Sequence, residues 1–467
     1  MASAFDQPVA QSALDQLLAA GGISGNASFD GGPLALDTRF HVAEGVSAAL
    51  AAGGIAATRL AERRGLNGGP VTVNTRLAEE SLRSYSHLAF DDPTAVASLE
   101  RHRELEPGYH QTADGRWFFL HPAFPHNTQG LMDLLDVATA GELPAAVGRR
   151  SAAELEQAVA DRGLCSAMAR SADEWDGSEA GQVLNTRPVV DIVQIGDSDP
   201  IDAPSGAGDR PLSGINVLDL TRILAGPTCA RTLASYGATA TRIGAEHLPS
   251  IALFTVDTGF GKRSRFLDLR QSAGRDSLRS MVAEADVFSQ GYRTGAMDRL
   301  GFGAADVAAM KPGIVYVSIN CYGHEGSWRT RPGWEQLAQT VTGMGMEHGR
   351  SHNDGVPMLQ PAAVTDYATG YLAAYGAMVA LARRAEVGGS YWVRVSLSRT
   401  AVFYRSLGLR SDVAAEAVSG AELDAMRAVT ATDWGDVHHL RPAVRIGKAS
   451  ADNPVRWDLP PVPLGSN

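Results

Sequence analysis

Polar and basic residues surround a strand, turn and helix pattern that begins at residue 215. The apolar run from Ile215 to Leu220 is typical of a buried parallel strand, and Ala225-Gly226-Pro227 predicts a turn at its carboxyl end. Helical spacing follows from Thr228 to Tyr236. Anions bind in the crevice beyond such strand ends, because free backbone N–H groups and the helix dipole favour negative charge. The pattern therefore predicts a site for an anionic ligand at this turn.

A basic patch lies a little further along the chain. Lys262, Arg263, Arg265 and Arg270 surround a predicted short strand from Phe266 to Leu269. The whole chain is acidic, with a formal net charge of -11. Binding to a nucleic-acid backbone requires a broad basic face, so nucleic acid is disfavoured as the main partner. A local patch on an acidic protein favours a small anionic molecule instead.

Length and composition set the broad class. The 467 residues, 44% of them hydrophobic, are enough for two domains or for one large domain with an insertion. The three cysteines, Cys165, Cys229 and Cys321, form no CxxC pattern and predict neither a disulfide framework nor a zinc site. The N-terminus lacks a basic signal region, and no uncharged apolar run is long enough to cross a bilayer, so we expect a cytoplasmic protein without a membrane span.

A degenerate internal repeat links two distant parts of the chain. Residues 42–84 and 370–401 both follow the order Ala-rich helix, Gly-Gly break and strand. One constant shift along the chain aligns two landmarks, an Arg-Arg pair and a Gly-Gly pair: Arg63-Arg64 with Arg383-Arg384, and Gly68-Gly69 with Gly388-Gly389. We interpret this similarity as a duplicated helix-turn-strand unit, although Ala-rich sequence can also match by chance.

The remaining segments differ in pattern. Asp114-Gly115 predicts a hairpin, and helical patterns follow it, so residues 101–200 are interpreted as an α+β insert. Strand and helix alternate again from Ile215 to Ile319, as in a doubly wound sheet. The tail, residues 411–467, predicts a few short strands at the surface.

Six sequence blocks follow one another within residues 211–410: VLDLTRILAGP, GKRSRFLDLR, ADVFSQGYRTGAMDRLGFG, KPGIVYVSINCYG, RPGWEQLAQTVTG and TDYATGYLAAYGAMVALARR. In this order they resemble the family III CoA-transferases, the group of formyl-CoA and carnitine CoA-transferases that also includes the α-methylacyl-CoA racemases. The resemblance implies an α/β fold with a doubly wound, Rossmann-like large domain and a smaller α+β domain, here placed before the large one. We divide the chain into a truncated repeat (1–92), the small domain (93–200), the CoA-binding catalytic large domain (201–410) and a returning tail (411–467).

The resemblance implies two catalytic carboxylates. The family's nucleophilic aspartate falls on Asp366, ahead of Gly370, and would carry CoA between two carboxylic acids through an anhydride and an aspartyl-CoA thioester. We expect the helix that Asp366 opens to lower its pKa. Glu335 falls at the family's acidic position near the site. Without the family blocks, the residues around Asp366 favour a helix cap, whereas Glu335 is equally interpreted as a solvent-facing helix residue.

The resemblance also implies where CoA binds and which chemistry is disfavoured. The racemase histidine falls on Trp334, whose indole cannot shuttle a proton, so racemisation needs another histidine such as His324 or His348. A CoA-binding protein without catalysis stays a third hypothesis, because the family's Gly-rich loop is missing. We expect acyl-CoA and a small carboxylic acid as substrates, no metal, and a homodimer, possibly interlocked. The implied CoA contacts are Leu224, Ala225, Lys262, Leu267, Arg270 and Arg299.

Overall fold

A computed structural model describes residues 3–92, 105–122, 124–204, 206–411, 414–447 and 453–466. Its centre is a seven-stranded sheet in which every neighbouring pair is parallel except the last, where β7 runs antiparallel to β13. The predicted α/β class is confirmed. In spatial order the strands are β10 (Lys262–Phe266), β9 (Thr239–Gly244), β8 (Asn216–Leu220), β11 (Val287–Gln290), β12 (Val315–Asn320), β13 (Ser390–Ser396) and β7 (Asp191–Gly196).

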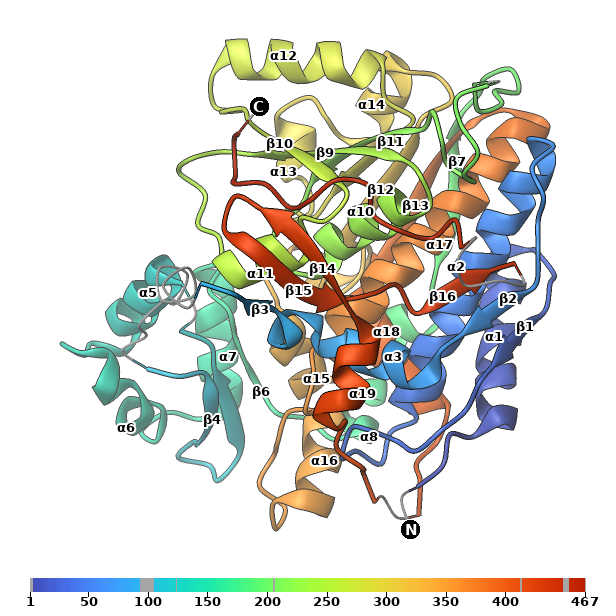
Figure 1. Cartoon of the computed structure of the whole chain (residues 1–467). Coiled ribbons are helices and arrows are strands. Elements are labelled where there is room, and N and C mark those ends of the chain that lie inside the picture. The colour runs from blue at the N-terminus through green and yellow to red at the C-terminus, as the bar shows by residue number, and fades with distance from the viewer. Residues whose placement is uncertain are drawn as a thin grey trace.

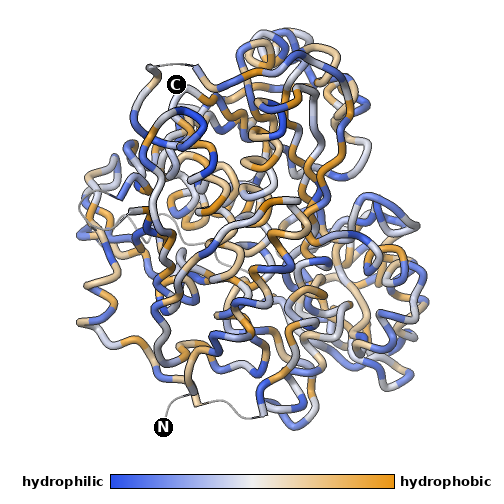
Figure 2. Tube along the Cα trace, turned by 90° about the vertical axis from the view of Figure 1, so that its right-hand side faces the viewer, coloured by the Kyte–Doolittle hydropathy of each residue, from blue (hydrophilic) through white to orange (hydrophobic). Residues whose placement is uncertain are grey.

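Helices cover both faces of this sheet (Figure 1). The sheet has one hydrophobic core on each face. Alternate residues of a strand pack into different cores, since successive side chains point to opposite faces. Val217 and Val287 pack in the core that includes α10 and α17, whereas Leu218 and Phe288 pack with α12 and α14. Hydrophobic segments accordingly run through the interior of the trace in Figure 2. The helices are α10 (Ala225–Ser235), α17 (Val364–Val387), α12 (Ser272–Ala283), α13 (Ala296–Arg299) and α14 (Ala304–Met310).

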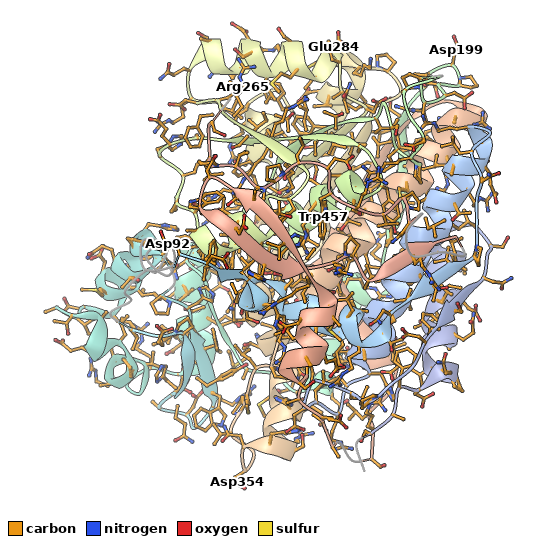
Figure 3. The ribbon with its side chains drawn as sticks, in the orientation of Figure 1. Asp92, Asp199, Arg265, Glu284, Asp354 and Trp457 are labelled. Atoms are coloured by element: carbon orange, nitrogen blue, oxygen red, sulfur yellow. The ribbon has the colours of Figure 1, made fainter. Side chains whose placement is uncertain are left out.

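The basic patch lies in strand β10 itself. The predicted strand from Phe266 to Leu269 is wrong, because β10 ends at Phe266. The apolar residues in FLDL suggested that the strand begins at Phe266. The observed strand β10 lies at the edge of the sheet, where it pairs on one side only and directs its charged side chains outward. Arg263 and Arg265 are exposed, and Figure 3 shows Arg265 on the outside of the sheet. Lys262 faces inward and is buried.

A small lobe lies to one side of the large sheet (Figure 1, left). The hairpin predicted at Asp114-Gly115 is confirmed, since β4 and β5 pair antiparallel around it. Its helices enclose a core of their own that includes Phe118, Leu131 and Leu155. The elements of the lobe are β4 (Gly108–Gln111), β5 (Trp117–Leu120), α5 (Pro125–Leu135), η2 (Ala140–Glu142), α6 (Leu143–Val147), α7 (Ala152–Asp161) and β6 (Ser166–Met168).

The N-terminal segment packs against helix α17 on the right of Figure 1, and strands β14 and β15 of the tail lie at the centre of the view. Helix α2 lies beside α17, and two further three-stranded sheets join the segment to the tail, in the orders β1-β2-β16 and β14-β15-β3 (Figure 1). Their elements are α1 (Gln7–Gly21), β1 (Ala27–Phe29), α2 (Val42–Arg63), β2 (Val71–Val73), α3 (Thr75–Glu80), η1 (Ser81–His87), β3 (Ala89–Phe90), α19 (Gly420–Met426), β14 (Arg427–Thr432), β15 (Gly435–Leu440) and β16 (Val444–Ile446).

Shorter helices complete the structure. Among the described residues, no helix is both long enough and apolar enough to span a bilayer. The short helices are α8 (Ala172–Gly177), α9 (Glu179–Asn185), α11 (Ala252–Asp257), η3 (Ser327–Thr330), α15 (Glu335–Val341), α16 (Met344–His352) and α18 (Leu397–Ser406).

Candidate active site

A cleft of about 250 Å³ opens at the carboxyl ends of β8, β11, β12 and β13. The chain proceeds from β8 to β9 on one side of the sheet and from β11 to β12 on the other, so the cleft lies at the topological switch point. Residues 220–226, 291–293, 319–321 and 331–334 line it, together with Asp366 and Leu397. The predicted ligand turn therefore forms one wall of a real cavity.

Backbone strain marks this wall. Ile223 has a φ of 72°, in the left-handed region that a β-branched side chain rarely adopts. Such a conformation costs about 1–3 kcal/mol and persists where the surrounding structure imposes it, typically at ligand sites. The turn directs the backbone of Leu224 and Ala225 toward the cleft, where the sequence analysis expected CoA contacts.

Asp366 reaches the cleft from the first turn of the 24-residue helix α17. Close packing against α10 sets its position. A Cβ on Gly370 would lie 2.5 Å from the Ala225 carbonyl oxygen and 2.6 Å from Thr228 Cβ, closer than side chains approach. The glycine in the turn after Asp366 therefore lets α17 cross α10 closely enough to bring the carboxylate to the cleft wall.

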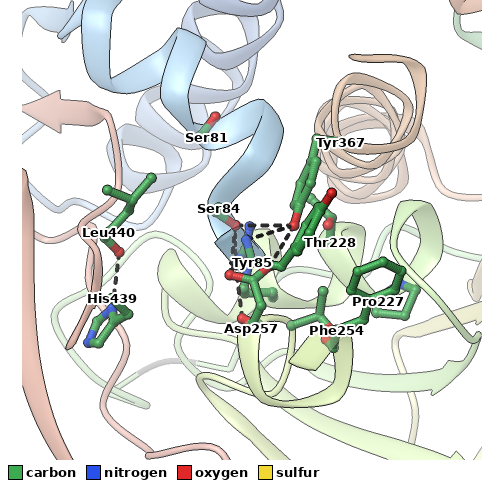
Figure 4. A network of polar contacts seen from close by, with 12 residues as sticks. Ser81, Ser84, Tyr85, Pro227, Thr228, Phe254, Asp257, Tyr367, His439 and Leu440 are labelled. Atoms are coloured by element: carbon green, nitrogen blue, oxygen red, sulfur yellow. Dashed lines mark hydrogen bonds and ion pairs between the residues drawn. The ribbon is translucent and has the colours of Figure 1, made fainter. Parts of the chain in front are cut away.

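A buried polar network holds the same turn of α17 in place. The Asp257 carboxylate accepts hydrogen bonds from Ser84 Oγ at 2.6 Å, Tyr367 Oη at 2.8 Å and Arg231 Nη1 at 2.9 Å. Figure 4 shows Ser84, Asp257 and Tyr367 converging from three different elements. Because Tyr367 follows Asp366 directly, the N-terminal segment and α11 help to fix the carboxylate.

Glu335 caps the start of α17 from the neighbouring helix α15. Its carboxylate accepts the N–H of Thr365 at 3.1 Å and that of Asp366 at 2.5 Å, and it also accepts from the Thr365 hydroxyl. The side chain is buried, so the interpretation of Glu335 as a solvent-facing residue is wrong. Glu335 acts on the site by positioning Asp366, because it lies outside the residues that line the cleft.

The two neighbouring carboxylates change the expected pKa of Asp366. Burial and then the charge of Glu335 raise that pKa well above its usual range. Burial also raises the pKa of Glu335, although its hydrogen bonds oppose the change. The expectation that the helix start lowers the pKa of Asp366 is therefore wrong, since the N–H groups of Thr365 and Asp366 are directed at Glu335 instead.

Aromatic side chains close the cleft on the side of the small lobe. Trp334 stacks between two rings of that lobe, His121 at 5.4 Å and Phe124 at 5.1 Å between ring centroids. Phe124, His126 and Cys165 line the cleft with it. The small lobe thus supplies part of the roof over Asp366.

Three cleft arginines were not predicted. Arg222, Arg293 and Arg331 all line the cleft. Arg331 lies 3.8 Å from Glu156, but neither Arg222 nor Arg293 has an acidic partner among the described residues. All three stand in sequence blocks quoted above, in LTRILAGP, QGYRTG and RPGW. Their position beside strand ends could have predicted that they reach the cleft. They give the cleft an anion-attracting wall.

The other predicted CoA contacts do not line this cleft. Lys262 is buried beneath it, where its ammonium group donates to Asp219 and to the Pro227 carbonyl, each at 2.7 Å. Leu267 is buried in the second core. Arg270 is exposed and paired with Asp268, and Arg299 is exposed on α13. Of the predicted site residues, Leu224, Ala225 and Asp366 line one cleft, and Glu335 lies behind Asp366.

Comparison with known proteins agrees with this geometry. The sequence model of CoA-transferase family III matches residues 212–428, which include every strand end around the cleft. These residues, a little under half of the chain, are therefore similar to CoA-transferase family III. The part of the chain described here contains no cluster of three or more His, Cys, Asp or Glu side chains arranged to hold a metal ion.

The named relatives to which the chain is similar are transferases. An acetyl-coenzyme A transferase of Hypoxylon pulicicidum is 30% identical over 66% of this chain and 55% of its own length. An acyl-CoA transferase of Gibberella moniliformis is 36% identical over 54% of this chain and 46% of its own. The chain thus spans about half the length of these curated relatives. The crystal structure of Rv3272 from Mycobacterium tuberculosis is 27% identical and covers 42% of this chain and 57% of its own, with a TM-score of 0.39.

Proposed function

We propose that this protein moves CoA between an acyl-CoA thioester and a small carboxylic acid, with Asp366 as the nucleophile. The observation that carries the proposal is a carboxylate at the wall of a switch-point cleft, held there by Gly370 and Glu335. The transferase names of its relatives support the same reaction class. The cytoplasmic location and the homodimer remain predictions of this proposal.

In the proposed mechanism the Asp366 carboxylate attacks the thioester carbonyl. The C–S bond breaks, which gives a mixed anhydride and a CoA thiolate. The thiolate then attacks the aspartyl carbonyl and releases the donor acid, leaving an aspartyl-CoA thioester. Attack by the acceptor carboxylate reverses these steps, forms the new acyl-CoA and restores Asp366.

The surroundings of Asp366 suit these steps. A carboxylate kept out of bulk water is poorly solvated, so less solvent must be removed before it attacks. The guanidinium groups of Arg222 and Arg293, which have no acidic partner among the described residues, attract anionic substrates to the cleft. Trp334 opposes the racemase alternative, because the family's second proton-transfer group is replaced by a ring that cannot exchange a proton.

Mass spectrometry tests the proposal directly. The protein is incubated with a panel of acyl-CoAs, digested and searched for a CoA adduct on the peptide that contains Asp366. The control is Glu44→Gln, which changes a buried carboxylate in the first turn of α2 that does not line the cleft. We expect an adduct in the native chain and in Glu44→Gln, and none in Asp366→Asn. Entry of solvent deuterium at the substrate α-carbon without any adduct contradicts the proposal and favours the racemase.

A further inference from the structure

Two parts of the chain share one arrangement of helix, strand and antiparallel partner. One constant difference in residue number, the element shift, relates Val42, the first residue of α2, to Val364, the first residue of α17. The same difference relates Asn74, the N-cap residue after β2, to Ser396, the N-cap residue after β13. Both caps accept the N–H three residues ahead. This element shift is slightly larger than the shift that aligns the Arg-Arg and Gly-Gly pairs of the internal repeat. Those pairs lie at helix ends and in loops.

The antiparallel neighbours of β2 and β13 correspond as well. Ile446 in β16 pairs with Val71, and Ile192 in β7 pairs with Val393, at the positions that the element shift makes equivalent. The residues before these strands read Arg-Pro-Ala-Val from Arg441 and Arg-Pro-Val-Val from Arg187. The β2–β16 pair is therefore the counterpart of the β13–β7 pair, built from the two ends of the chain.

The space beside β13 and β7 is filled. It measures only about 30 Å³ and is closed by residues 183–184 of α9 and by the loop 323–325. Two of its three arginines are neutralised, because Arg394 pairs with Asp191 at 2.5 Å and with Glu325 at 3.2 Å, and Arg187 also pairs with Glu325. The third, Arg399, donates to the Arg187 carbonyl. A helix and an acidic loop thus cover this strand pair.

The counterpart space beside β2 and β16 is open. It is a groove of about 930 Å³, and its lining includes Arg441 and Arg445 at the positions that Arg187 and Asp191 occupy in the other pair. No lining residue corresponds to Glu325, and of the residues equivalent to α9 the lining includes only His439, the counterpart of Asn185. Trp457, labelled in Figure 3, lines the groove and lies 5.8 Å from the His439 ring.

The groove carries a net positive charge, because Arg76, Arg441, Arg445 and Arg456 outnumber Asp30 and Glu422 in its lining. Within the described ranges, Arg441 and Arg445 have no side-chain hydrogen bond and no carboxylate within ion-pair distance. The acidic residues of the lining are already engaged, since Asp30 accepts from the Thr75 N–H at 2.9 Å and Glu422 pairs with Arg76. Two guanidinium groups therefore face the groove where the other strand pair meets an acidic loop.

We propose that the groove between β2, β16 and the tail binds an acidic peptide segment of a partner protein. The segment would supply the carboxylates and the covering surface that α9 and the Glu325 loop supply at the equivalent strand pair. Carboxylates suit this position because guanidinium groups bind them through paired N–H bonds. The proposal does not depend on the reaction at Asp366, which lies in a different cavity.

Fluorescence anisotropy with a dye-labelled octaglutamate peptide tests this proposal on the full chain. We expect salt-sensitive binding to the native protein, at least about tenfold weaker binding to the Arg441→Gln, Arg445→Gln double variant, and no binding of octaglutamine. A matched control replaces Arg279 and Arg350, two exposed arginines outside the groove, by Gln and should bind as the native chain does. Circular dichroism confirms folding of both variants.

Three results overturn the proposal. The first is absence of octaglutamate binding to the native chain, and the second is equal loss in the double variant and the matched control. The third is displacement of the peptide by inorganic phosphate or ADP at concentrations below those at which octaglutamate itself binds. That result makes the groove a phosphate site instead.

Discussion

The starts of α17 and α2 place a carboxylate at the same position of two packed helices, with opposite consequences. Asp366 and Glu44 both stand in the first turn, as the third residue of their helices. Asp366 lines a cleft and has another carboxylate, Glu335, beside it. Glu44 is fully buried, accepts the Asp6 N–H at 2.8 Å and contacts His41 at 3.3 Å, and it is paired with Arg410.

The protonation of these two residues therefore differs in direction. Burial and then Glu335 raise the pKa of Asp366. For Glu44, burial also raises the pKa, but the hydrogen bond to His41 and the charge of Arg410 outweigh it and lower the pKa overall. The comparison teaches that a helix start does not by itself make a carboxylate reactive. Of the two, the proposed nucleophile is the one that has no cation paired with it among the described residues and that opens to a cavity.

The largest expected effect separates the two carboxylates by activity. Asp366→Asn should reduce CoA transfer by at least about a thousandfold, as removal of a covalent nucleophile does. Glu44→Gln should retain transfer within about threefold at a temperature where it is folded, because Glu44 does not line the cleft. Steady-state assays of both variants check this pair. Substantial CoA transfer by Asp366→Asn would show that Asp366 is not the nucleophile, and the comparison of Asp366 with Glu44 would then lose its basis.

The same two variants should change stability in opposite directions. At a pH above the usual pKa of a glutamate, the ionised Glu44 side chain stabilises the fold. This contribution is lost as the pH falls through the lowered pKa of Glu44 in the folded protein. Glu44→Gln should therefore cost about 3 kcal/mol of unfolding free energy at pH 7. Asp366, whose pKa is raised, destabilises the fold as the pH rises through that pKa, so Asp366→Asn should gain about 1 kcal/mol at pH 7.

Urea unfolding at pH 7 and at pH 4 measures both stability differences. Both should shrink at the lower pH, because carboxyl groups become protonated in the folded or the unfolded state. A stabilising Glu44→Gln contradicts the interpretation of Glu44 as a structural ion-pair residue.

Gly370→Ala tests whether close helix packing sets the position of Asp366. The added methyl group meets backbone and side-chain atoms of α10, so we expect a loss of about 2–3 kcal/mol of stability. We also expect at least about tenfold slower transfer, since displacement of a reacting group by about 1 Å is costly. Gly420→Ala is the matched control, because a Cβ there meets nothing within 4 Å. Unchanged activity in Gly370→Ala argues against this role of the glycine.

The smallest effect concerns the pH profile. Transfer requires ionised Asp366, so the rate should fall on the acid side of the raised pKa. Glu335→Gln removes the adjacent negative charge and should move that acid limb to lower pH by up to about one unit, while also slowing transfer through the weakened helix cap. The profile of kcat/KM against pH measures the shift. An acid limb that stays in place indicates that Asp366 does not limit the rate there.

Local patterns in the sequence were sufficient for much of the fold and for the centre of the site. The apolar run before the turn at 225–227, the hairpin at Asp114-Gly115 and the helix that carries Asp366 depend on nearby residues, and each lies where it was expected. The identity of the nucleophile was suggested by ordered motifs rather than by spacing. The position of β10 was missed because its inward residues are Lys262 and Ser264, which no hydrophobic pattern reveals.

Only the tertiary structure decided which polar groups meet. Sequence alone determined that this is an α/β chain with a carboxylate opening a long helix and basic residues after several strands. It did not determine that Glu335 takes the N–H groups at that helix start, or that Arg222 and Arg293 reach the cleft while Lys262 is paired with Asp219 beneath it. A pKa depends on burial and on charges brought together from distant segments, so it follows from the packing and not from the order of residues.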